Sequence, residues 1–307
     1  MGIEEAAALS AAFLWSISSF VWSRVKLSAI QLNTAKNMIG LMLLTVHVIV
    51  LILLSSGAED SENTFQLRAS LEAWGWLALS GAIGIVLGDT LFFRSLQILG
   101  PRRALVMATF SPIFAAAVSW VVLGEILVAF QIVGILTSVI GIVIVVSERG
   151  ARQEAMDLFP GSQTAGVLLG IGAAFCQAAG AAVSKLGMNQ DDCSALEASL
   201  IRMAFAAIGS MLIITAQRKA GELFKSLSDW KLSRKVMLAS ILGTWLGIWL
   251  SQVAIKETEV GIAQTLLATS PLFAIPLVRI IEGHKPSWLA IAGTLLAVFG
   301  IALTVWN

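Results

Sequence analysis

Apolar blocks of about 20 residues alternate with short polar stretches along the whole sequence. A helix of that length crosses the roughly 30 Å of hydrocarbon in a lipid bilayer. The 307 residues are 57% hydrophobic and only 13% charged, whereas an ordinary soluble domain is about 25% charged. Such a chain cannot keep its surface in water. The sequence therefore predicts an all-α integral membrane protein embedded in a lipid bilayer.

Setting the apolar blocks against the polar breaks between them predicts ten transmembrane helices. Five are expected in the first half, over residues 4–23, 33–55, 73–97, 103–123 and 127–147, and five in the second, over 164–184, 196–216, 236–255, 259–281 and 287–306. The charged stretch SERGARQEAMDLFPGSQ between the two groups is typical of a linker. We expect repeats over residues 1–147 and 164–307, joined by residues 148–163.

The first of these blocks is preceded by acidic residues. Glu4 and Glu5 stand near the N-terminus with no basic residue before the apolar block. A cleavable signal peptide begins with a positively charged region. We therefore expect the first block to be a retained transmembrane helix.

The second half of the sequence repeats the first at an offset of about 159 positions. Matches of glycine and proline are informative because these residues fix backbone geometry. The aligned pairs are Gly84 with Gly243, Gly88 with Gly247, Ser111 with Ser270, Pro112 with Pro271, Phe114 with Phe273, Gly124 with Gly283, Gly134 with Gly293 and Gly141 with Gly300. One offset serves three consecutive blocks, so the duplication is the strongest internal signal.

Each half has an odd number of expected helices, so the two repeats must lie in the membrane in opposite orientations. Inverted repeats are typical of transporters, in which one half moves against the other around a central site. Pro112 and Pro271 fall inside the expected helices, where a proline frees a carbonyl and permits a kink. The alternative is a kink needed only for packing. The glycine pairs, which include Gly88 and Gly247, predict close helix packing.

Several segments carry a pattern in a fixed order. In the first half they are AAFLWSISSFVWSRVK, GDTLFFRSLQILGPRRA, SPIFAAAVSWVVLGE and QIVGILTSVIGIVIVVSE; in the second they are AAFCQAAGAAVSKLG, LIRMAFA, SPLFAIPLVRIIEG and IAGTLLAVFGIAL. Over nearly the whole chain this pattern resembles the EamA-type transporters of the drug/metabolite transporter superfamily. The resemblance implies two inverted five-helix repeats around a central cavity, with the fifth and tenth helices peripheral. It also implies export of small metabolites such as amino acids.

The charged residues within the expected helices are the main candidates for a substrate site, because each costs a few kcal/mol to insert into lipid. Asp89 and Arg94 are five residues apart and so differ by about 140° around a helix. A direct pair between them requires a bend or a partner on another helix. Asp89 is a candidate carrier of a coupling proton, or an acid held by neighbouring helices. Its counterpart at the repeat offset is the apolar Ile248.

Two basic residues lie near the start of the second expected helix of each half. Lys36 and Arg202 are candidates for binding an anionic group such as a substrate carboxylate. Snorkelling of the side chain to the membrane interface is the alternative. The sequence departs from the family pattern at Lys36, which replaces an arginine, and at Gly283-His284, which replaces Gly-Glu.

Neutral polar and aromatic residues complete the predicted cavity wall. Glutamine amides within lipid seek partners across helices, so they either line a cavity or join helices. The candidates of this kind are Gln177, Gln252 and Gln264, with Trp15 and Trp249 as aromatic walls. Gln264 is preferred because it lies about two turns before Pro271.

The sequence contains no pattern typical of an enzyme. No nucleophile triad, metal-ligand cluster or phosphate-binding loop is present, and Cys176 and Cys193 have neither a metal spacing nor a disulfide framework. We expect no enzymatic activity, no cofactor and no metal. The absence of a basic cluster of nucleic-acid type predicts no nucleic-acid partner.

The sequence favours a secondary transporter that exports a small metabolite, an amino acid or a related compound, across the plasma membrane by alternating access. The alternative is a proton-coupled exporter of diverse cations or drugs. Both termini are expected on one side of the membrane. A basic loop over residues 218–235 predicts cytoplasmic placement of that loop and therefore external termini, whereas the family resemblance implies cytoplasmic termini. Both a monomer and a homodimer are compatible with the sequence.

Overall fold

The computed structural model describes residues 2–22, 24–55, 68–99, 104, 107–147, 162–190, 193–273 and 288–305, and every regular element in these ranges is a helix. In the first half these are α1 (Ile3–Trp22), α2 (Ala29–Ser55), α3 (Leu71–Ser80), η2 (Gly81–Gly88), α4 (Asp89–Leu99), α6 (Ser111–Leu123) and α7 (Ala129–Ser147). In the second half they are α8 (Gln163–Met188), α9 (Ala195–Ala216), α10 (Ala220–Leu227), α11 (Trp230–Ala239), η3 (Ser240–Leu246), α12 (Gly247–Glu257), α13 (Val260–Leu267) and α15 (Trp288–Thr304).

The described helices have the length and composition of membrane spans. Six helical stretches are long and apolar enough to cross a bilayer, and shorter apolar helices cover Ser111–Leu123, Ala129–Ile144, Val260–Phe273 and Ile291–Thr304. Large apolar side chains such as Leu54, Val121 and Leu212 are mostly exposed on the outside of the bundle. Such a surface is stable against lipid but not against water. This agrees with the predicted all-α membrane protein, and the number of ten spans remains a prediction.

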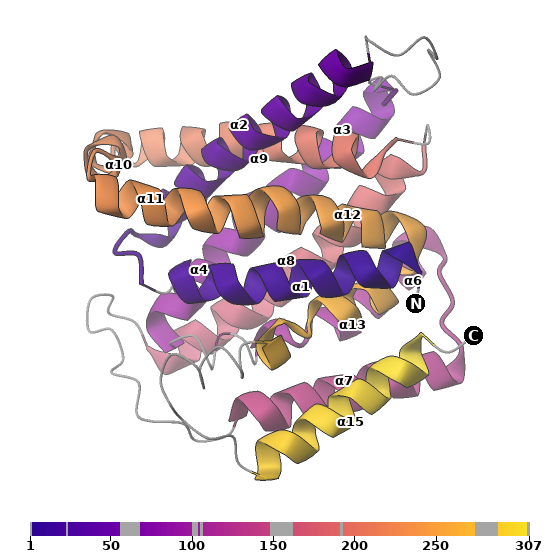
Figure 1. Ribbon diagram of the computed structural model, residues 1–307. Coiled ribbons are helices and arrows are strands. Elements are labelled where there is room, and N and C mark those ends of the chain that lie inside the picture. Colours follow the sequence, from indigo (N-terminus) through magenta and orange to yellow (C-terminus); the bar gives the residue numbers. More distant parts are fainter. Residues whose placement is uncertain are drawn as a thin grey trace.

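The bundle has a main body and a separate helix pair (Figure 1). α7 and α15 pack against each other along one side of the main body. Their glycines allow the close approach, since a Cβ added at Gly141 would touch the backbone of Ala297 and Gly293. The N- and C-termini lie at one end of the bundle, and α10 lies at the opposite end (Figure 1).

Two π-helical segments interrupt long helices at equivalent places in the two halves. η2 begins at Gly81 and η3 at Ser240, which is the repeat offset of 159 positions. A π-helical turn shifts the hydrogen-bond register and is frequent at functional sites. Asn33 on α2 donates its amide to the carbonyls of Ile85 and Val86 at 2.9 and 3.1 Å. The long helices thus change their hydrogen-bond register at matched positions, and in the first half Asn33 from a neighbouring helix bonds to the π-helical segment.

The predicted close packing of the glycine pairs joins one half of the chain to the other. A Cβ at Gly180 on α8 would lie 2.8 Å from the Cα of Gly84 on η2. In the second half, a Cβ at Gly243 on η3 would collide with the hydroxyl of Ser18 on α1. The first helix of each half therefore packs against the π-helical segment of the other half.

The fourth expected helix of each half is broken before its Ser-Pro pair. Turns occur at Thr109–Phe110 and at Ala268–Thr269, again separated by 159 positions. Pro112 lies in the first turn of α6, where its missing N–H would have no intrahelical partner in any case. Pro271 has the same place after the second turn. The prediction of continuous helices with an internal proline kink is corrected here, because both prolines begin a helix.

The basic stretch after α9 also differs from the expected loop. It contains the short helix α10, and the following long helix begins at Trp230 instead of residue 236. α10 is amphipathic, with Leu223 fully buried and Phe224 half-exposed. Its apolar residues are too few to register as a span, so the sequence pattern indicated only a polar break.

Candidate functional site

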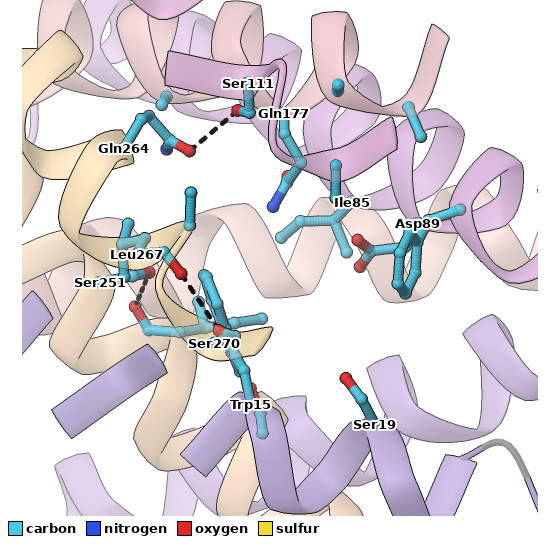
Figure 2. Close-up of a pocket in the computed structure, with 18 of the residues that line it drawn as sticks. Trp15, Ser19, Ile85, Asp89, Ser111, Gln177, Ser251, Gln264, Leu267 and Ser270 are labelled. Atoms are coloured by element: carbon cyan, nitrogen blue, oxygen red, sulfur yellow. Dashed lines mark hydrogen bonds between the residues drawn. The ribbon is translucent and has the colours of Figure 1, made fainter. Parts of the chain in front are cut away.

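A cavity of about 190 Å³ lies inside the main body of the bundle. Its described lining comes from both halves: α1, α2, η2, α4, α6, α8, α9, η3, α12 and α13, together with the two breaks before the Ser-Pro pairs. α7 and α15 contribute none of the described lining residues. Figure 2 shows the labelled side chains arranged around an open space between these helices.

An ion pair spans one side of the cavity. Nζ of Lys36 on α2 lies 2.7 Å from Oδ2 of Asp89, the first residue of α4 after η2. Lys36 also donates to Oδ1 of Asn37 at 2.8 Å. The Lys36 side chain is 5% exposed and that of Asp89 is 21% exposed. The carboxylate of Asp89 points toward the open space (Figure 2), with its charge balanced by Lys36.

Arg202 on α9 is the third charged residue among the described lining residues. It is 5% exposed, and its buried Nε has no hydrogen-bond partner. Its Nη2 lies beside Gly84, since a Cβ built there would be 3.3 Å away. No ion pair within 4 Å joins Arg202 to a described residue. Two cations and one carboxylate give the described lining a net charge of +1.

Neutral hydrogen-bonding groups face the cavity from several helices. The hydroxyl of Ser111 donates to Oε1 of Gln264 at 3.0 Å and so joins the start of α6 to α13. Gln252 on α12 accepts from the hydroxyl of Ser184 at 2.5 Å. Gln177 on α8 projects into the open space between Gln264 and Asp89 (Figure 2). Its amide is therefore available to a bound solute.

Aromatic rings close the remaining wall. Trp15 on α1 lines the cavity and donates Nε1–H to the carbonyl of Gly243 at 2.8 Å. About two helical turns further along α1, Trp22 packs edge to face on Phe93 with 6.2 Å between ring centroids. Small residues of α8, including Ala174, also line the cavity and take up little of its space. The wall can therefore contact the apolar part of a solute.

A second ion pair joins the two halves outside the described cavity lining. Oε1 of Glu125, just after α6, lies 2.8 Å from Nζ of Lys185 on α8. Oε2 of Glu125 accepts the N–H of Val260 at 2.9 Å, and Lys185 donates to the carbonyl of Thr258 at 2.7 Å. Val260 shares a packed cluster with Ala8 near the N-terminus. We call Glu125, Lys185, Thr258 and Val260 the terminal latch, because they connect the halves at the end that carries the termini.

Comparison with known families identifies the chain. The model of the EamA-like transporter family matches residues 3–147 and, a second time, residues 164–306. The chain belongs to the EamA-like transporter family. This EamA-like protein is thus a multi-pass membrane transporter, and the resemblance of its segments to the EamA type is confirmed.

Two further comparisons bear on its fold. A solved structure described only as "Crystal structure of protein" is similar with a TM-score of 0.72 and 18% sequence identity, over 98% of this chain and 96% of that chain. At this identity the likeness shows a shared fold alone. No curated protein matches the chain.

Most of the predicted site residues meet at the cavity of this EamA-like transporter. The lining includes Trp15, Lys36, Asp89, Gln177, Arg202, Gln252, Gln264 and Pro271. The residues that do not line it are Arg94, Trp249, Pro112, Gly88 and Gly247.

Four of the residues outside the cavity have positions that explain their absence. Arg94 lies on the same helix as Asp89 but about 140° around it, as the residue spacing requires. Trp249 packs edge to face on His47 of α2, with 4.8 Å between centroids. A Cβ at Gly88 would lie 3.1 Å from Cβ of Cys176, and one at Gly247 would touch the Trp15 indole. These two glycines provide close packing behind the cavity wall.

The hydroxyl groups of the cavity wall were not predicted from the sequence. Ser18, Ser19, Thr109, Ser111, Thr244, Ser251 and Ser270 line it, as do Trp22, Phe92 and Phe93. A signal was present in α1, where Trp15, Ser18, Ser19 and Trp22 recur at the i, i+3, i+4 and i+7 spacing of one helix face. Single hydroxyls in apolar sequence carry little information, because they also bond to their own helix, as Ser251 does to Ile248.

Proposed function

We propose that this protein is a secondary transporter that exports a small metabolite, an amino acid or a related compound, across the plasma membrane by alternating access. In this proposal ten helices form two inverted repeats, residues 1–147 and 164–307, with residues 148–163 between them. Membership of the EamA-like family indicates that the protein is a transporter. The substrate class, the direction of transport and the identity of the membrane are our inference.

The observation that carries the proposal is the cavity between matched helix interruptions. Asp89 and Ile85 line it at the end of η2, and Ile248 lines it just after η3. Ser111 and Ser270 line it where the two broken helices resume. Discontinuous helices around a central site are typical of secondary transporters, because exposed backbone groups and helix ends there can contact a solute.

The packing of the halves supports a rocking movement. The first helix of each half packs on the π-helical segment of the other half through Gly180 and Gly243. Interfaces of small residues have few interlocking side chains to separate. The terminal latch joins the two halves at one end by polar contacts. Polar contacts can be exchanged for water when that end opens.

The size of the cavity favours a small metabolite. Sites for drug-sized ligands occupy about 300–1,000 Å³, whereas this cavity is about 190 Å³. The lining combines one net positive charge, several amides and hydroxyls, and an aromatic wall. This composition fits a compact polar or amphipathic compound.

The alternative, a proton-coupled exporter of cations or drugs, has less support from the geometry. Such a transporter needs a carboxylate that is available to a cation. Asp89 is the carboxylate among the described lining residues, and it already lies 2.7 Å from Lys36. The described lining is also net positive, which repels cations.

The test is untargeted metabolite analysis of the medium from cells that express the wild type, Asp89→Asn or Arg94→Ala at matched levels. We expect a compound enriched by the wild type and by Arg94→Ala, whose residue does not line the cavity, but not by Asp89→Asn. Media that all match the empty-vector control would contradict export of cell metabolites. Equal enrichment by all three proteins would leave transport intact and remove Asp89 from the site.

A further inference from the structure

We propose that the exported solute is a compact organic acid with net negative charge, and that the Arg202 guanidinium binds its acidic oxygens. This inference rests on the proposed function and narrows the substrate class of the same cavity. It depends on the charge balance of the lining, the unpartnered state of Arg202 and the groups that surround the guanidinium.

The charge balance is the first step. Lys36 and Asp89 neutralise each other across 2.7 Å, so Arg202 supplies the net charge of the described lining. A zwitterionic amino acid would satisfy Arg202 with its carboxylate but would also bring an ammonium group. The carboxylate of the described lining that could receive an ammonium, Asp89, is already paired with Lys36. An acid without a compensating amine matches the lining better.

The second step is the environment of Arg202. Buried charges in proteins are paired or hydrogen-bonded, because desolvation of an isolated charge is unfavourable. Arg202 is only 5% exposed, yet its buried Nε has no hydrogen-bond partner. Snorkelling to the interface does not explain this, because the residue lines an internal cavity. A bound anion would supply the missing acceptor.

The third step is the space around the guanidinium. Nη2 of Arg202 and Oε1 of Gln177 would lie 3.3 and 3.6 Å from a Cβ at Gly84, so both head groups converge on this glycine. Both side chains line the cavity, and Gln177 can turn its NH₂ group toward a second oxygen of the solute. Planar guanidinium and acidic oxygens form two parallel hydrogen bonds. The remainder of the solute would lie toward Trp15 and Phe93 on the aromatic wall.

The test uses purified full-length protein in liposomes loaded with the small-molecule fraction of a cell extract. The compounds released through the wild type, Arg202→Gln, Arg202→Lys and Arg94→Gln are identified by mass spectrometry and sorted by net charge at pH 7. Arg94→Gln is the matched control, because it removes the same charge from a transmembrane helix without touching the cavity lining.

We expect wild type and Arg94→Gln to release one or more organic acids, and Arg202→Gln to release them roughly ten- to a hundredfold more slowly, as for loss of a hydrogen bond to a charged group. Arg202→Lys keeps the charge but not the two parallel bonds, so we expect an intermediate rate. Release of phosphate esters in place of carboxylic acids would support the same anion site, with Arg202 binding a phosphate group of the solute instead of a carboxylate.

Three results would overturn the inference, and they are distinguishable. Release of neutral or cationic compounds that Arg202→Gln leaves unchanged would show a transporter whose substrate is not an anion. No release beyond protein-free liposomes would remove the proposed function and the inference with it. Arg202→Lys gives the third result and keeps the test open if Arg202→Gln does not fold. A folded lysine variant that releases an acid at the wild-type rate would show that bidentate binding by Arg202 is not needed.

Discussion

The Lys36 ammonium lies 2.7 Å from the Asp89 carboxylate and thereby ties α2 to α4 at the point where the π-helical segment η2 ends. The two residues are 53 positions apart in sequence, and the pair forms part of the cavity wall. The contact has both a structural and an electrostatic consequence. It fixes the position of the helix after the π-helical segment, and it neutralises the one carboxylate of the described lining.

Asp89→Asn should destabilise the protein by about 3 kcal/mol, because it leaves the ammonium of Lys36 buried without its partner. The double variant Lys36→Gln, Asp89→Asn should recover most of that loss, since both charges are then absent. Unfolding in detergent, followed by tryptophan fluorescence, measures the double-mutant cycle. Strictly additive losses would show that the two groups do not interact.

Arg202→Gln should not destabilise the empty protein and should raise its free energy of unfolding by about 1 kcal/mol. Removal of a buried charge without a partner relieves a desolvation penalty, and such functional residues often reduce stability. The same unfolding measurement tests this in the absence of solute. A loss of more than about 2 kcal/mol would indicate a structural partner for Arg202, as for removal of a buried paired charge.

Glu125→Ala should loosen the terminal latch. Its carboxylate accepts the N–H of Val260 and pairs with Lys185, so its loss exposes the start of α13 to local opening. Hydrogen–deuterium exchange of peptides covering residues 257–267 should become several-fold faster. Glu72→Ala is the control, because Glu72 is exposed and its carboxylate accepts a long hydrogen bond from the Trp76 indole, at 3.4 Å on the same helix. Unchanged exchange in Glu125→Ala would show that the latch does not hold this end.

Gly180→Ala should destabilise the protein by about 1–3 kcal/mol through overpacking. Its Cβ would lie 2.8 Å from the backbone Cα of Gly84, which cannot move without shifting η2. Gly75→Ala, in α3, has no atom within 4 Å of the new Cβ and should stabilise the helix by about 0.5–1 kcal/mol. Thermal unfolding midpoints of the two variants should therefore move in opposite directions. A common direction would contradict the close approach of α8 and η2.

The duplicated glycines and prolines show how far the sequence alone determines the fold. Gly84 and Gly243 were predicted to mark close packing, and the structure places helices of the opposite half against both. The sequence could not show that the helices break before Pro112 and Pro271, because Thr109, Phe110, Ala268 and Thr269 have no strong preference for turns. The break depends on packing around the cavity.

The site was predictable by residue type but not by partner. Charged residues are rare in apolar helices, and this rarity alone pointed to Lys36, Asp89 and Arg202. Which of them form a pair depends on the angles between three helices. Trp249 illustrates the limit, because its contact with His47 on the far side of α12 depends on helix rotation that the sequence pattern does not specify.

The most direct test of alternating access is the accessibility of the cavity from each side of the membrane. Ala174 lines the cavity and is 2% exposed, so Ala174→Cys in a background of Cys176→Ser and Cys193→Ser provides a single reporter. A membrane-impermeant maleimide is added to vesicles of either orientation. We predict labelling from both faces, slowed by the exported solute. Labelling in only one of the two vesicle preparations, while transport continues, would show that the cavity opens to one face only and would contradict the account.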